Sequence, residues 1–345
     1  MLKNFAGRQE FGPFLLNIGE VASSDQEDGI MVIADRVMDA REKIGFRLRG
    51  LYSGCGYSRY KMSKFEEYDF YSRNRDFLFS KSVLTFTDPN GRLMALKPDV
   101  TLSIVKNVKD QPGAVRKLYY HENVYRVSAA ADGFREETQV GLECMGEVDG
   151  ACVAEVLKLA AESLRLCSEH FVLEVSHLGL LEAFVDAIAP DARVKELLLA
   201  CAGEKNLHGI SRLCRERGLA EGAEEPLKQL LSLYGAPRSV MPRIRALAER
   251  NGVGEAAAEL GRAMTVFTGS DLEDRVQIDF SAAGDLKYYN GIIFRGFISG
   301  IPGCVLSGGQ YDTLMRKMGR KDRAIGFAVF LDLLERLKEE VGEDA

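Results

Sequence analysis

The 345-residue sequence has no run of 18 consecutive apolar residues, and its N-terminus has no basic segment that leads into an apolar stretch. A helix that spans a bilayer needs about 20 mostly apolar residues, and a secretory signal needs a basic segment followed by an apolar one. We therefore expect no contact with a membrane and a cytoplasmic location.

Positive charge is also in short supply. Lysine and arginine together number 45, against 51 aspartates and glutamates, so the net charge is −6. Sequence-independent binding of nucleic acid depends on clustered basic side chains that neutralise phosphates. The charge balance therefore predicts that nucleic acid is not a partner.

Signatures of metals and cofactors are missing as well. The seven cysteines form no Cys-x-x-Cys pair, and the four histidines lie far apart in the sequence. There is no G-x-x-x-x-G-K-[ST], no dinucleotide-binding glycine motif after a strand, no H-E-x-x-H and no G-x-S-x-G. We expect reduced, mostly buried thiols, no metal and no cofactor, and the commonest enzyme signatures are absent.

What the sequence does contain is enough apolar material for a core, 46% of its residues. Helical and alternating patterns can be read along its first half. They predict, in order, a helix over 30–49 that Gly50 can end, two short strands over 83–96 around the turn Asp88–Gly91, a helix from about Asp99 to Val108, a hairpin of 117–127 with 137–146, a helix over 152–167 and a strand over 171–175.

The second half begins with helical texture and returns to strands. Helices are predicted over 192–202, 204–217, 224–234, 238–250 and 254–267, then strands over 275–280, 288–297 and 304–306, a glycine turn at Gly308-Gly309, and a last helix from about Gly326 to Glu340. Strands joined mostly by hairpins indicate an α+β fold with an antiparallel sheet. We expect a core formed by 1–175 and 271–345, interrupted by a helical insertion over 176–270.

The stretch from Leu96 to Gly146 gathers polar groups on segments predicted to be neighbours. It contains two carboxylates, a hydroxyl, a guanidinium and an amide, on Asp99, Glu143, Thr101, Arg126 and Gln139. This set predicts a polar pocket suited to a zwitterion. Taken alone, the later Tyr288-Tyr289-Asn-Gly segment reads as core and turn, because aromatic side chains dominate cores.

Several motifs, taken in order, resemble the catalytic domain of the histidyl-tRNA synthetase family. They are Leu-Lys-Pro-Asp-Val-Thr from Leu96, Leu-Tyr-Tyr followed by Tyr125-Arg126, Gln-Val-Gly-Leu-Glu from Gln139, Tyr288-Tyr289-Asn-Gly, Ser-Gly-Gly-Gln-Tyr-Asp from Ser307, and Ile-Gly-Phe-Ala from Ile325. The similarity spans about residues 30 to 338. It implies a class II synthetase-like antiparallel sheet flanked by helices, with a histidine pocket lined by Asp99, Thr101, Gln139, Glu143, Tyr288 and Tyr289.

The same resemblance points to lost catalytic positions. The arginine that contacts the activated carboxylate in the family is replaced by Gly284, and the arginine that grips ATP is replaced by Leu333. Each such donor typically contributes about 3 to 4 kcal/mol to the transition state. Ser63 and Gln310 are milder departures from the pattern. Arg126, which matches a retained arginine, implies residual affinity for an anion or nucleotide, although it can equally be an arginine paired with a neighbouring carboxylate.

A synthetase-like domain without these arginines, and without the expected anticodon-binding domain, resembles the family of regulatory subunits of ATP phosphoribosyltransferase. That resemblance implies a non-catalytic protein that partners a short-form catalytic subunit in the first step of histidine biosynthesis. It further implies a homodimer within a hetero-oligomer and histidine as the feedback effector.

Two other readings stay open at this point. The chain can be an active amino-acid adenylating ligase with a non-tRNA acceptor, in which Lys287 or Arg295 replaces a lost guanidinium. ATP–pyrophosphate exchange distinguishes this reading from a regulatory role. A tRNA sensor is the third possibility, and the acidic charge balance argues against it.

Overall fold

A computed structural model describes residues 37–78, 83–109, 111–128, 133–281 and 288–335, and the described residues from Ala40 onward belong to one compact unit. The first helix of that unit, α2, spans Ala40–Gly54. The prediction that Gly50 ends this helix is wrong. Leu48 and Tyr52 continue the buried face of α2 on either side of Gly50, and this packing outweighs the weak helix propensity of glycine.

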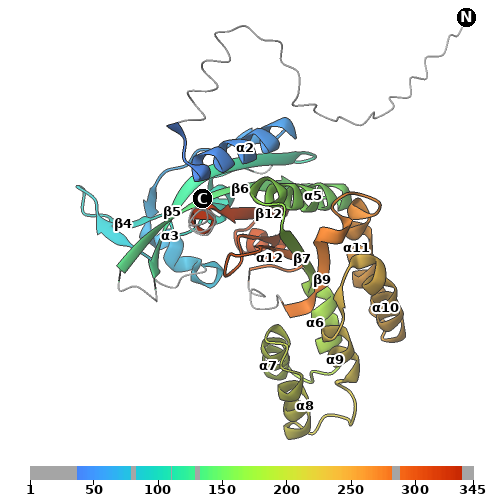
Figure 1. The fold of residues 1–345 in the computed structure, drawn as a ribbon. Helices are drawn as coiled ribbons and strands as arrows, with labels where there is room; N and C mark the ends of the chain where they lie inside the picture. The colour runs from blue at the N-terminus through green and yellow to red at the C-terminus, as the bar shows by residue number, and fades with distance from the viewer. Residues whose placement is uncertain (1–36, 79–82, 110, 129–132, 282–287, 336–345) are drawn as a thin grey trace, which may run out of the picture. The chain divides into compact units, whose positions relative to one another are not determined.

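The centre of the unit is a nine-stranded sheet with the order β1-β5-β6-β12-β11-β10-β7-β9-β8 (Figure 1). Neighbouring strands are antiparallel except β1 with β5 and β7 with β9. The predicted fold class is therefore confirmed. The strands span Ser58–Arg59 (β1), Val115–Ser128 (β5), Gly133–Gly146 (β6), Phe171–His177 (β7), Tyr234–Gly235 (β8), Val276–Asp279 (β9), Ile292–Ile298 (β10), Leu306–Gln310 (β11) and Arg323–Phe330 (β12).

The hairpin of β5 and β6 is the longest pairing in the described sheet. Its register runs without interruption from Val115 opposite Gly146 to Ser128 opposite Gly133. Successive side chains along both strands point to opposite faces of the sheet, so residues two apart share a face. The predicted hairpin is confirmed, and its tip at 129–132 lies outside the described residues.

A smaller sheet of order β2-β4-β3 precedes the hairpin, with β2 at Phe65–Glu67, β3 at Thr85–Thr87 and β4 at Leu93–Leu96. The predicted turn between β3 and β4 is confirmed, since the Asp88 carboxylate accepts hydrogen bonds from the backbone N–H groups of Asn90 and Arg92. The α-helix α3 (Tyr68–Arg73) and the 3-10 helix η1 (Arg75–Phe77) follow β2.

Two predictions near the C-terminus are wrong. Residues 323–330, partly predicted as a helix, form β12 between β6 and β11, and only the short 3-10 helix η5 (Leu331–Glu335) follows among the described residues. Gly308 and Gly309 lie inside β11 rather than in a turn. A Cβ on Gly308 would collide with the carbonyl oxygen of Gly326 on β12, so glycine allows these strands to pack closely.

One face of the sheet is covered by helices. The helix α5 (Gly150–Cys167) contacts β7, β10 and β12, and α2 contacts both α5 and the β5–β6 hairpin. Tyr52 on α2 joins the two helices through a 2.9 Å hydrogen bond with Ser163 on α5, and its ring packs edge-on against Phe327 of β12. The opposite face of the central strands is left for the pocket described below.

A helical segment separates β7 from β9. It comprises α6 (Leu178–Asp186), α7 (Ala192–Gly203), α8 (Leu207–Glu216), α9 (Glu225–Leu231), α10 (Pro237–Arg250) and α11 (Gly254–Met264), with the 3-10 helices η2 (Thr265–Phe267) and η3 (Glu273–Arg275) after it. The predicted helices are confirmed, apart from shifts of a few residues at their ends, but α6 was missed. Among the described residues, no helix combines the length and the apolar character needed to cross a bilayer.

Candidate functional site

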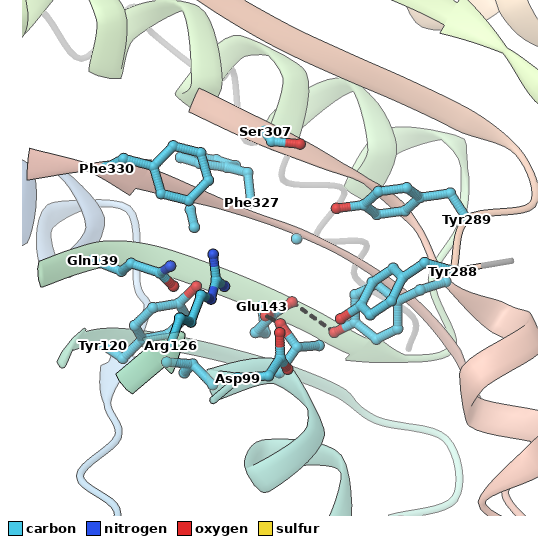
Figure 2. Close-up of a pocket in the computed structure, with 15 residues that line it drawn as sticks. Asp99, Tyr120, Arg126, Gln139, Glu143, Tyr288, Tyr289, Ser307, Phe327 and Phe330 are labelled. Carbon is cyan, nitrogen blue, oxygen red and sulfur yellow. Dashed lines mark hydrogen bonds between the residues drawn. The ribbon is translucent and has the colours of Figure 1, made fainter. Parts of the chain in front are cut away.

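The polar residues predicted to form a pocket do line a single pocket on the open face of the sheet (Figure 2). Gln139 and Glu143 lie four residues apart on β6 and so share that face. The remaining predicted residues, Asp99, Thr101, Arg126, Tyr288 and Tyr289, join them. Sequence reasoning had not assigned several other lining residues to the pocket, namely Val100, Tyr120, Ser307, Tyr311, Gly326, Phe327, Ala328 and Phe330.

Asp99 begins the helix α4 (Val100–Asn107) and caps it. Its carboxylate accepts a 2.8 Å hydrogen bond from the backbone N–H of Leu102, which satisfies one of the free donors at a helix start. Lys97, two residues before Asp99, connects this turn to β5 through a 2.8 Å ion pair with Glu122. Burial raises the pKa of Asp99 above its ordinary value, although the N–H of Leu102 and the charge of Arg126 lower it.

Glu143 is the most enclosed charged group of the pocket, with 1% of its surface exposed. Its two carboxylate oxygens accept 2.6 Å hydrogen bonds from the hydroxyls of Thr101 and Tyr311. Burial raises the pKa of Glu143 to about 8, while the two hydroxyl donors lower it and the charge of Asp99 raises it further. Two carboxylates with raised pKa values in one pocket are suited to a ligand that brings positive charge or N–H donors.

Gln139 supplies the complementary group. Its side chain is 4% exposed, and its amide nitrogen Nε2 has no hydrogen-bond partner among the described residues. Buried donors are rarely left unpaired in proteins, so this amide is suited to a ligand acceptor. In Figure 2 it lies with Arg126 on the side of the pocket opposite Tyr288 and Tyr289.

Arg126 shows the paired arrangement that the sequence left open. Its guanidinium donates to Glu137 at 3.1 Å and to the backbone oxygen of Pro98 at 3.3 Å. It is 18% exposed in its side chain, so the pair is largely shielded from water. The guanidinium therefore braces the start of α4 against the hairpin as well as lining the pocket.

Aromatic rings form the wall opposite Gln139. Tyr288 and Tyr289 meet edge to face with centroids 4.7 Å apart, and Tyr311 lies 6.0 Å from Tyr288. Both Tyr288 and Tyr289 are 7% exposed. The two rings therefore pack in the core and at the same time line the pocket. Tyr311 belongs to the motif Ser-Gly-Gly-Gln-Tyr-Asp, but nothing in its sequence context indicates that its hydroxyl reaches Glu143.

Gly326 on β12 lines the pocket, and its lack of a side chain makes room for Glu143. A Cβ on Gly326 would collide with the Glu143 carboxylate and lie 2.5 Å from the carbonyl oxygen of Leu142. Even with glycine there, the cavity volume is only about 30 Å³, room for about two water molecules. A larger ligand therefore requires the side chains around the cavity to move apart.

Of the two positions predicted to lack a catalytic arginine, the structure describes only that of Leu333. Leu333 lies in η5 as a partly buried apolar residue against the core, and the adjacent Asp332 accepts hydrogen bonds from Arg41 and the backbone of Thr138. Gly284 and Lys287 lie outside the described residues. Arg295 lies on β10, opposite Ser307 on one side and Glu174 on the other.

The described part of the chain contains no group of three or more histidine, cysteine, aspartate or glutamate residues arranged to hold a metal ion. The pocket residues themselves include carboxylates, an amide and phenols, but no serine, cysteine or lysine nucleophile hydrogen-bonded to a base among the described contacts. The arrangement is therefore suited to binding a small polar molecule.

The raised pKa of Glu143 predicts a pH-dependent stability. Between its ordinary pKa of 4.5 and the folded value of about 8, the folded chain holds a proton that the unfolded chain has released. The free energy of unfolding therefore falls as pH rises through this window. Glu143→Gln removes the effect, so urea titrations should show the variant gaining about 2 kcal/mol on the wild type between about pH 5 and pH 7. An unchanged difference at the two pH values would contradict the assignment.

Comparisons with known proteins show which family the chain resembles. The family model described as histidyl-tRNA synthetase matches residues 30–334. An ATP phosphoribosyltransferase regulatory subunit from Clostridium kluyveri is 30% identical over 293 residues, which cover 83% of this chain and 74% of that protein.

Solved structures share the fold. A protein from Bacillus halodurans, described as an ATP phosphoribosyltransferase regulatory subunit/histidyl-tRNA synthetase, superposes with a TM-score of 0.75 at 24% identity, covering 94% of this chain and 84% of that one. The HisG:HisZ ATP phosphoribosyl transferase complex from Thermotoga maritima contains a chain that superposes with a TM-score of 0.66 at 20% identity, with coverages of 84% and 96%.

Proposed function

The chain belongs to the histidyl-tRNA synthetase family, and from this premise we propose that its polar pocket binds histidine and that the bound histidine regulates a partner enzyme. Its curated relatives, which it matches over most of their length, are ATP phosphoribosyltransferase regulatory subunits. The chain accordingly has a regulatory, non-catalytic role in histidine biosynthesis, as its sequence predicted.

The observation that carries the ligand assignment is the set of complementary groups in one pocket. Glu143 and Asp99 offer buried acceptors for the N–H groups of an imidazole and an ammonium, and the unpaired Nε2 of Gln139 offers a donor to a ligand oxygen or nitrogen. The rings of Tyr288 and Tyr289 can pack against an imidazole. Histidine combines all of these features in one small molecule.

The regulatory role requires a catalytic partner, which we propose to be the short-form ATP phosphoribosyltransferase subunit. In this proposal the chain forms a homodimer within the hetero-oligomer and works in the cytoplasm, where its free cysteines would stay reduced. The proposed organisation is a synthetase-like core of residues 1–175 and 271–345 that carries a helical insertion of 176–270.

Calorimetry with free amino acids tests the ligand assignment. We expect L-histidine to bind the wild-type chain and leucine to bind at least about 1,000-fold more weakly, because an apolar side chain offers no N–H group to the buried carboxylates of the pocket. Histidinol, which lacks the carboxylate, is expected to bind with intermediate affinity. Equal affinity for leucine and histidine, or no binding of histidine, would contradict the proposal.

A further inference from the structure

A group of polar side chains ties together the two ends of the helical segment α6–α11. His177, the last residue of β7, caps α6 by accepting a 3.0 Å hydrogen bond from the N–H of Leu180 at Nδ1. Its other nitrogen, Nε2, lies 3.4 Å from the carboxylate of Glu259 on α11. One histidine–glutamate contact therefore joins the helix that begins this segment to the helix that ends it.

Glu259 also faces the strands next to the pocket. Its second carboxylate oxygen lies 3.9 Å from the guanidinium of Arg323, at the start of β12. Arg323 in turn pairs at 3.2 Å with Asp312, whose other oxygen accepts a 2.9 Å hydrogen bond from the N–H of Ala324. Asp312 begins the helix α12 (Asp312–Lys317) immediately after Tyr311.

Gln310 is fixed in place next to the pocket. Its Oε1 accepts a 2.6 Å hydrogen bond from the N–H of Ile292 on β10. Gln310 is 1% exposed, and the next residue is Tyr311, whose hydroxyl donates to Glu143 inside the pocket.

The contacts around Glu259 have room to rearrange. A cavity of about 240 Å³ lies beside them and is lined by Glu259 and Arg323 among others. The 3.9 Å separation of these two groups is the longest step in the network, and charged pairs at such distances contribute little to stability. An alternative pairing of Glu259 is therefore energetically accessible, whereas buried Gln310 and Asp312 are held by backbone groups.

We propose that Asp312, Arg323 and Glu259 couple the pocket to the helical segment α6–α11, so that a ligand in the pocket changes the packing of α6 against α11. The proposal rests on the proposed histidine pocket. Because the cavity between the lining side chains is about 30 Å³, a bound histidine must displace some of them. Tyr311 lines the cavity and precedes Asp312 in the chain, so its displacement shifts the Asp312–Arg323 pair that faces Glu259. Coupling needs such an element with two arrangements that both sites bias.

Hydrogen exchange followed by mass spectrometry tests this coupling on the full chain, with calorimetry run in parallel. Adding L-histidine to the wild type should change the exchange rates of α6 and α11 amides at least about fivefold, the lower end of typical couplings. Glu259→Gln should still bind histidine but lose this change. Glu255→Gln is the matched control, since Glu255 lies one turn earlier on α11 and pairs with the exposed Arg262.

The outcomes separate the two proposals. Histidine binding to the wild type with no change in α6 and α11 would overturn the coupling and leave the pocket assignment standing, as would a full response in Glu259→Gln. No binding of histidine to the wild type would overturn both. If Glu259→Gln does not fold, Arg323→Gln replaces it, because Arg323 is half-exposed and its loss breaks the route from Asp312 to Glu259. The control should respond like the wild type.

Discussion

Glu143→Ala should weaken the binding of histidine at least about 100-fold, a loss of about 3 kcal/mol. The substitution removes the acceptor that we assign to the ligand, and it also leaves the hydroxyls of Thr101 and Tyr311 without the carboxylate to which both donate. The fold should survive, because a buried carboxylate with a raised pKa adds no stability of its own at neutral pH. Calorimetry on the purified variant measures the loss.

The matched control for this experiment is Glu147→Ala. Glu147 lies just past the end of β6 on the same stretch of chain, but its side chain is exposed and does not line the pocket. The control should bind histidine like the wild type. Wild-type affinity in Glu143→Ala would show that histidine binds elsewhere and would remove the pocket from the regulatory account.

The second large effect is the absence of amino-acid activation. The wild-type chain should support no histidine-dependent ATP–pyrophosphate exchange above background under conditions in which an active histidyl-tRNA synthetase is readily measured. Each missing guanidinium costs roughly two to three decades in rate. At one of the two predicted positions stands Leu333, an apolar residue that packs against the core.

Restoring one of the two arginines provides the control for this prediction. Leu333→Arg alone should not restore exchange, because the position of Gly284 would still lack its arginine. Exchange by the wild type with any amino acid would contradict the non-catalytic role directly and would favour an adenylating ligase.

How far the sequence predicts the fold depends on whether local or distant contacts decide a segment. The β5–β6 hairpin and the α4 start at Asp99 follow from alternation and capping, which are local. The strand β12 does not, since its apolar run Ala-Ile-Gly-Phe-Ala-Val-Phe suits a helix or a strand buried on both faces. Its pairing with β6 and β11 makes it a strand. These partners are distant in sequence, so a short stretch of sequence does not predict them.

The site shows the same limit. Asp99, Gln139 and Glu143 could be predicted because motifs place them on adjacent elements, and the structure brings them to one pocket. Tyr120 lines the pocket because it lies opposite Gly141, a pairing that depends on the register of the hairpin. The contact of Arg323 with Glu259 joins residues on separate elements, so only the folded chain reveals it.

The most direct test of the regulatory role is reconstitution with a short-form ATP phosphoribosyltransferase catalytic subunit. The catalytic subunit is assayed alone and with an equimolar amount of this chain, each with and without histidine. The account predicts that this chain raises phosphoribosyltransferase activity and that histidine inhibits the pair more strongly than the catalytic subunit alone. Equal activity and equal histidine sensitivity with and without this chain would contradict it.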